Sequence, residues 1–117
     1  MSPKRGDRAA PPATGDAWDI RFANSDAANG WELLCKQAPG NTREAWERLR
    51  SDPRPHPPTQ RQHPLKDKLA SHTFRGRELS QWQYEVTGAG RIWYLLDDET
   101  RTVWLTWASP GHPRSTE

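Results

Sequence analysis

The chain has 117 residues and little of what a large hydrophobic core requires. Only 32% of its residues are hydrophobic, against about 45–50% in a typical soluble domain. No apolar run approaches the roughly 18–20 residues of a membrane helix, and no apolar segment follows the basic N-terminus. These absences argue against a membrane protein and against a secretory signal, so we expect a cytoplasmic protein with a small, aromatic core.

The sequence contains a single cysteine, Cys35, which excludes an intramolecular disulfide and a metal cage built from cysteines. Trp31, Leu34, Cys35 and Ala38 recur at the spacing of one helix face. On such a face a cysteine is more often a buried thiol than a nucleophile.

Proline divides the chain rather than being spread along it. Most of the eleven prolines fall in residues 1–12, 53–64 and 110–113, which we expect to be loops. Residues 1–16 show no periodicity and are predicted to be a disordered tail. Residues 17–114 then form one small domain.

Positive charge gathers in the middle of the chain, although the formal net charge is only +2. Residues 54–91 hold seven basic and three acidic side chains, whereas residues 1–53 hold eight of each. This middle segment is therefore expected to carry the positive potential of the surface.

Aromatic residues gather between Ser80 and Trp107, where four of the seven tryptophans and both tyrosines lie. Three runs of aromatic and branched residues are separated by Gly88-Ala89-Gly90 and by an acidic turn at residues 97–100. This pattern predicts a three-stranded antiparallel meander. Alternation along its middle strand places Arg91 and Trp93 on one face, opposite the side chains expected to contact helices: Trp82, Tyr84, Ile92 and Tyr94.

The segment before the meander predicts one strand and two helices. Residues 17–22 alternate as a strand does, and Asn24 or Ser25 can cap the helix that follows. We expect Pro39-Gly40 to end this helix, and Asn41 to cap a second helix that Pro53 stops. The predicted fold is α+β: an N-terminal strand, a helical hairpin and a meander whose sheet packs on the helices.

Three segments in this order resemble the RelE/ParE superfamily of bacterial toxins. They are H-P-L-K-D-K-L-A at 63–70, W-Q-Y-E-V-T-G-A-G-R-I-W-Y-L-L-D at 82–97 and A-S-P-G-H-P-R at 108–114. The chain is most similar to the RelE- and YoeB-type ribosome-dependent mRNA endonucleases, over roughly Trp18 to Arg114.

The resemblance implies the toxin of a type II toxin-antitoxin system, with an antitoxin, the ribosome and mRNA as partners. It implies cleavage of mRNA without metal or another cofactor, by attack of a 2′-hydroxyl on its own phosphate. Such chemistry requires a base, a cation that stabilises the charge on phosphorus, and an acid for the leaving oxygen.

The resemblance also assigns candidate residues. Arg91 occupies the family's arginine position, His112 that of a C-terminal histidine acting as acid or base, and His63 that of a glutamate base. Each also has a purely structural interpretation, as a turn, tail or loop side chain. The candidate RNA-binding residues are Lys66, Lys68, Arg77, Trp93 and Arg114.

Two departures keep other functions open. Gln83 and Glu85 stand where RelE-type members place lysines, and the C-terminal tyrosine of several relatives is missing. A ParE-like inhibitor of DNA gyrase is one alternative. A binding protein with this fold and no catalysis is another.

Overall fold

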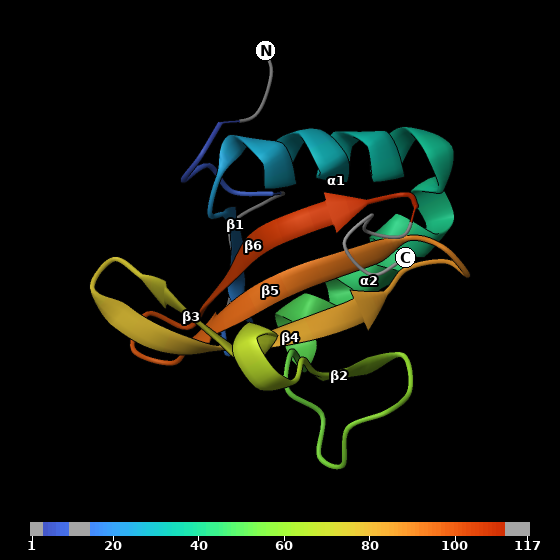
Figure 1. Ribbon diagram of the computed structural model, residues 1–117. Helices are drawn as coiled ribbons and strands as arrows, with labels where there is room; N and C mark the ends of the chain where they lie inside the picture. The colour runs from blue at the N-terminus through green and yellow to red at the C-terminus, as the bar shows by residue number, and fades with distance from the viewer. Residues whose placement is uncertain (1–3, 10–14, 112–117) are drawn as a thin grey trace.

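The computed structural model describes residues 4–9 and 15–111, which contain two helices and six strands (Figure 1). In chain order they are β1 (Asp19–Phe22), α1 (Ser25–Gln37), α2 (Pro39–Ser51), β2 (Gln62–Pro64), β3 (Ser71–Phe74), β4 (Arg77–Glu85), β5 (Arg91–Asp97) and β6 (Thr102–Ser109). A 3-10 turn, Asp67–Leu69, lies between β2 and β3. The predicted α+β class is confirmed.

The strands form one mixed sheet in the order β1-β6-β5-β4-β2, with β3 paired to β4 off this path. β1 runs parallel to β6, and the other pairs are antiparallel. The described residues therefore contain six strands where the sequence predicted four, and the two additional strands are β2 and β3.

Both helices lie on the same side of the sheet (Figure 1), where they enclose the main core. From the sheet this core takes side chains that alternate along each strand, as one face of a pleated sheet requires. The predicted helix-facing residues all belong to it: Trp82, Tyr84, Ile92 and Tyr94.

Helix α1 lies close to β6 at two of its residues. Asn24 hydrogen-bonds to the strand, and Gly30 has no side chain to keep the strand away. Asn24 caps the helix by accepting from the Ala27 N–H at 2.7 Å, and its amide donates to the Thr106 carbonyl at 3.0 Å. A Cβ atom on Gly30 would lie 1.7 Å from the Ala108 carbonyl oxygen, so only glycine fits this approach.

The predicted start of the second helix is wrong by three residues. α2 begins at Pro39, directly after α1, and Ala38 is its N-cap. Proline suits the first turn because its ring presets φ and its missing N–H has no helical partner there. Asn41 is thus inside the helix, and its amide donates to the Val86 carbonyl at 3.0 Å instead of capping.

The prediction that residues 53–64 lack regular structure is wrong at their end, where β2 pairs with β4. Pro64 is tolerated because β2 is a short edge strand. Gln62 is buried, and its amide donates to the Tyr94 hydroxyl at 3.0 Å and to the Asp52 carbonyl at 3.1 Å. These bonds satisfy a polar side chain at a position that otherwise suits an apolar one.

β3 and β4 form a hairpin that projects beyond the rest of the sheet (Figure 1). Its turn places Arg75 and Gly76 at positive φ values of 54° and 79°. Phe74 packs with a second, smaller cluster on the side of the sheet away from the helices: Ala23, Leu79, Leu95 and Trp104.

Part of the stretch expected to lack structure runs beside β1. The Gly6 N–H donates to the Phe22 carbonyl at 2.8 Å, and the Ala9 N–H donates to the Ile20 carbonyl at 2.7 Å. The rest of that prediction concerns residues 1–3 and 10–14, which lie outside the described residues. Neither described helix is long and apolar enough to cross a membrane.

Candidate functional site: the open face of the sheet

The side of the sheet away from the helices carries a row of side chains from four adjacent strands. Register places His63 of β2 opposite Gln83 of β4, Gln83 opposite Trp93 of β5, and Trp93 opposite Trp107 of β6. All four are partly exposed. Arg91 and Glu85 form the next pair on the same face, two residues from Trp93 on β5 and from Gln83 on β4. We call these six residues the open face.

The two tryptophans of the open face pack on one another. Their ring centroids lie 5.0 Å apart, with the planes tilted by 47°. The Trp93 Nε1–H donates to Gln83 Oε1 at 2.9 Å, which fixes the rotation of that indole. The sequence predicted Trp93 on this face and left open whether it packs on another tryptophan; it does so with Trp107.

Arg91 lies on the open face, as alternation predicted, and is held by its neighbours. Its Nη1 donates to the carbonyls of Thr87 and Gly90, each at 3.0 Å. Its Nη2 lies 3.7 Å from Glu85 Oε2, and only 12% of its side chain is exposed. Two donors of the guanidinium are therefore used by the backbone, and the N–H groups on Nη2 and Nε are left for the ion pair or a ligand.

His63 lies on the open face because β2 extends the sheet beyond β4. Its Nδ1 is 3.1 Å from the Pro64 carbonyl oxygen. A carbonyl only accepts hydrogen bonds, so in this contact Nδ1 carries the proton and Nε2 keeps a lone pair in the neutral ring. His63 and Arg91 do not contact each other; strand spacing and rise put their Cα atoms roughly 12 Å apart.

The other predicted RNA-binding residues fall into two groups. Lys66 and Lys68 are exposed on and beside the 3-10 turn that follows β2, with no acidic partner among the described residues. Arg77 is at the opposite end of β4 from Glu85, about 26 Å away at 3.3 Å per residue. The structure thus brings the lysines, but not Arg77, to the β2 edge of the sheet, beside the middle of β4.

Arg77 belongs instead to an ion-pair cluster. Its guanidinium donates to Asp97 Oδ2 at 2.6 Å and to Glu99 Oε2 at 3.0 Å. The Asp97 side chain is only 3% exposed and also accepts from Trp104 Nε1 at 3.2 Å. Desolvation alone would raise the pKa of Asp97, but the hydrogen bonds from Arg77, Trp104 and the Thr100 N–H outweigh it and hold that pKa below its ordinary value.

His112 and Arg114, predicted as a catalytic and an RNA-binding residue, lie outside the described residues. The described chain ends two residues after β6, whose last residue, Ser109, pairs with Arg91. No described group of three histidine, cysteine, aspartate or glutamate side chains is placed to hold a metal ion.

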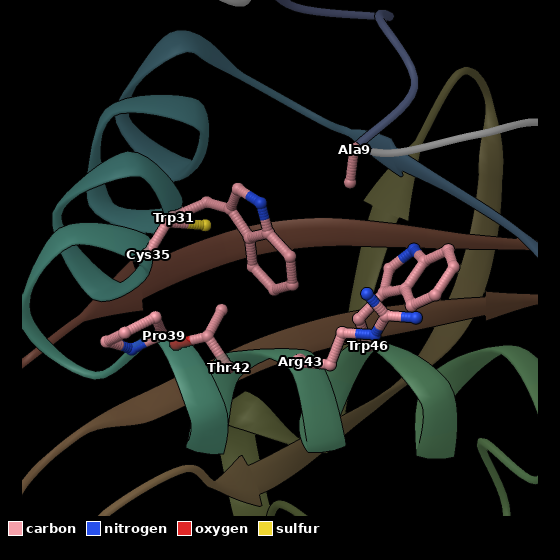
Figure 2. Close-up of a pocket in the computed structure, with 7 residues that line it drawn as sticks. All are labelled: Ala9, Trp31, Cys35, Pro39, Thr42, Arg43 and Trp46. Atoms are coloured by element: carbon pink, nitrogen blue, oxygen red, sulfur yellow. The ribbon is translucent and has the colours of Figure 1, made fainter.

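A hollow of about 350 Å³ lies between the two helices, on the side of the sheet opposite to the open face (Figure 2). Trp31 and Cys35 line it from α1, and Trp46 lines it from α2 with the Arg43 guanidinium 5.6 Å from its ring centroid. Burial, with a smaller contribution from Glu32, raises the pKa of the Cys35 thiol. A raised pKa suits a packed thiol rather than a nucleophile.

Sequence reasoning missed the part that Gln83 and Trp107 take in the site. The sequence marks Gln83 only as a glutamine where related toxins have a lysine, and no local pattern reveals that it faces Trp93 across the sheet. Aromatic content gave the only usable signal, since both tryptophans lie in the densest aromatic segment of the chain. No family model, curated protein or solved structure matches this chain.

Proposed function

We propose that this protein is the toxin of a type II toxin-antitoxin system and that it cuts mRNA on the ribosome without a metal ion. One observation carries the proposal: the open face holds a cation, a histidine with a free lone pair and a partly exposed indole, namely Arg91, His63 and Trp93. An α+β fold with one strand and two helices ahead of the other strands also supports the proposal.

The base in the proposed reaction is His63. In the neutral ring its Nε2 can take the proton from a ribose 2′-hydroxyl, because Nδ1–H is already bound to the Pro64 carbonyl. The 2′-oxygen then attacks the adjacent phosphorus, and the 5′-oxygen leaves with a proton from an acid. We assign that acid to His112 from the resemblance alone.

Arg91 supplies the cation. Its Nη1 is anchored to two backbone carbonyls, which orients the planar guanidinium before substrate arrives. Its Nη2 faces Glu85 at 3.7 Å, a long and partly exposed ion pair that a phosphate can displace. A bidentate contact to two phosphate oxygens is the geometry that guanidinium favours.

The surroundings favour a nucleic-acid substrate. The exposed Lys66 and Lys68 follow β2 on the side of His63 away from Arg91, and can contact phosphates on that side of the cut. Trp93 offers an aromatic surface for a base, and RNA sites use such stacking widely. The proposal implies a cytoplasmic protein, since its substrate is on the ribosome, and an antitoxin that covers this face.

Translation in a cell-free extract tests the proposal. Added protein should stop protein synthesis and leave mRNA fragments that end in a 2′,3′-cyclic phosphate. The result should be the same with a chelator that removes transition metals and leaves the Mg²⁺ that ribosomes require. His63→Ala and Arg91→Lys should each slow cutting by at least tenfold. Arg43→Ala, which removes an exposed cation on α2 that contacts Glu47 and the Trp46 ring, is the matched control and should cut normally.

A second candidate function is a binding protein without catalysis. The contacts of Arg91 favour it, because a guanidinium tied to two carbonyls and a glutamate also serves to hold the β4–β5 turn. Unaffected translation, with a protein partner recovered on the open face, would support this candidate. A gyrase supercoiling assay on the same preparation checks the ParE-like alternative.

A further inference from the structure

The orientation of the Gln83 amide is fixed by chemistry. The indole Nε1–H of Trp93 can only donate, so the Gln83 atom that lies 2.9 Å from it must be the carbonyl oxygen. The amide nitrogen therefore points away from Trp93. Among the residues that the structure describes, this nitrogen donates no hydrogen bond.

The neighbours of Gln83 form a surface that suits a nucleobase. On one side Trp93 and Trp107 pack at 5.0 Å between centroids and remain partly exposed, so they offer an aromatic surface that is held in place. On the other side His63 lies directly opposite Gln83 in the register. The row of four side chains spans roughly 14 Å at a strand spacing of about 4.8 Å, which is long enough for three stacked bases at about 3.4 Å each.

The charge around this row favours single-stranded RNA as the occupant. The edge of the sheet at β2 carries the exposed side chains of Arg61, Lys66 and Lys68, with two carboxylates beside them: Glu44, paired with Arg61 at 3.8 Å, and the exposed Asp67. A strand whose bases lie on the tryptophans can therefore place phosphates along that edge. Aromatic side chains beside a basic track are the usual arrangement for single-strand binding.

We propose that Gln83 reads the base that stacks on Trp93 and Trp107, and that it selects bases with a carbonyl at purine C6 or pyrimidine C4 over bases with an amino group at that position. This inference rests on the proposed function, in which RNA crosses the open face. A fixed N–H donor pairs with O6 of guanine or hypoxanthine and with O4 of uracil. It meets another donor at N6 of adenine or N4 of cytosine.

Rotating the amide to accept from an amino group would not remove this preference. The rotation would bring the amide N–H against the Trp93 N–H, so the indole would lose its acceptor in a partly buried position. Gln83 is thus a specificity residue whose orientation depends on Trp93, the residue opposite to it on β5.

Titrations followed by ¹⁵N NMR test the inference with four trinucleotides: UUU, CCC, AAA and a trimer of inosine. Inosine and adenosine stack alike and differ at the exocyclic group, as uridine and cytidine do. We expect the indole signals of Trp93 and Trp107 and the Gln83 amide signals to shift. Wild-type protein should bind UUU and the inosine trimer about fivefold more tightly than their partners, the ratio of one neutral hydrogen bond.

Three variants make the readout specific. Gln83→Glu presents only acceptors and should reverse the ratio, although its charge weakens binding of every trimer. Gln83→Met keeps the shape without hydrogen bonds and should bring the ratio near one. Gln37→Met, on an exposed glutamine at the end of α1, should leave the wild-type ratio unchanged.

Equal affinity of wild-type protein for each matched pair would overturn the inference, and this measurement needs no variant to fold. Absence of any shift would also overturn it and would point to a protein partner on this face. The translation assay reports separately on the proposed function. If the protein stops translation but shows no base preference, the proposed nuclease function stands and the role of Gln83 is wrong. If it shows the base preference but does not cut mRNA, the role of Gln83 stands and the nuclease function is wrong.

Discussion

Glu85 Oε2 lies 3.7 Å from Arg91 Nη2, across the directly paired residues of β4 and β5. A carboxylate at this point competes with a substrate phosphate for the guanidinium and repels it. Glu85→Gln should therefore raise the rate of RNA cutting by about twofold to fivefold, since a partly exposed pair is worth ~1 kcal/mol or less. Cut fragments in the translation extract measure this rate.

The control for this prediction is Glu47→Gln, which removes a carboxylate paired with Arg43 on the surface of α2. It should leave the rate unchanged. If Glu85→Gln instead lowers the rate by tenfold or more, Glu85 takes part in proton transfer and the assignment of the base to His63 is wrong.

The Asp97 cluster predicts a loss of stability in acid. The pKa of Asp97 is lowered in the folded protein, so its carboxylate stabilises the fold above the unfolded pKa, near 4, and this contribution disappears as the pH falls through the lower folded pKa. Urea unfolding at a series of pH values measures the effect. Asp97→Asn should be less stable than wild type at pH 7, and the difference should shrink below pH 4. A difference that stays constant with pH would contradict the ion-pair account.

Gly30 and Gly40 make a matched pair of helical glycines. Gly30→Ala would put a Cβ atom 1.7 Å from the Ala108 carbonyl oxygen, so α1 must move from β6, at a cost of about 3 kcal/mol or more. Nothing lies within 4 Å of a Cβ on Gly40, and Gly40→Ala should leave stability unchanged or raise it by up to about 1 kcal/mol. Thermal unfolding compares them. Equal stabilities would show that α1 does not approach β6 this closely.

Tyr94 connects the start of the loop after α2 to the sheet. Its buried hydroxyl donates to the Pro53 carbonyl at 2.7 Å and accepts from Gln62 at 3.0 Å. Tyr94→Phe leaves both partners short of a bond and should destabilise the fold by about 1–3 kcal/mol. Tyr84→Phe is the control, because the Tyr84 hydroxyl has no hydrogen bond among the described residues. Similar small effects for the two variants would argue against the connection.

Alternation and turn chemistry were sufficient to predict β1, both helices and the faces of the meander. They succeeded where the signal is local, as with Trp82 and Tyr84 against the helices. They failed at β2 and β3, because both strands contain few apolar residues, and β2 in addition pairs with a part of β4 that is about 20 residues away in the sequence. The buried Gln62 illustrates the difficulty, since its partners are distant in the sequence.

The candidate site was predictable only where its residues depend on a local pattern. Arg91 and Trp93 follow from strand parity, whereas the place of His63 depends on β2, an edge strand that its proline content argued against. Gln83 gained a role only through the residue opposite to it. Cross-strand partners depend on register, which the local pattern of one strand does not specify.

The most direct test of the proposed function is the 3′ end of mRNA fragments from a translation extract given wild-type protein or Arg91→Lys. The proposal predicts that wild-type protein yields fragments ending in a 2′,3′-cyclic phosphate on translated mRNA only. Arg91→Lys, folded by circular dichroism, should yield at least tenfold fewer. Intact mRNA with wild-type protein, or equal cutting by the two proteins, would contradict the central role given to Arg91 on the open face.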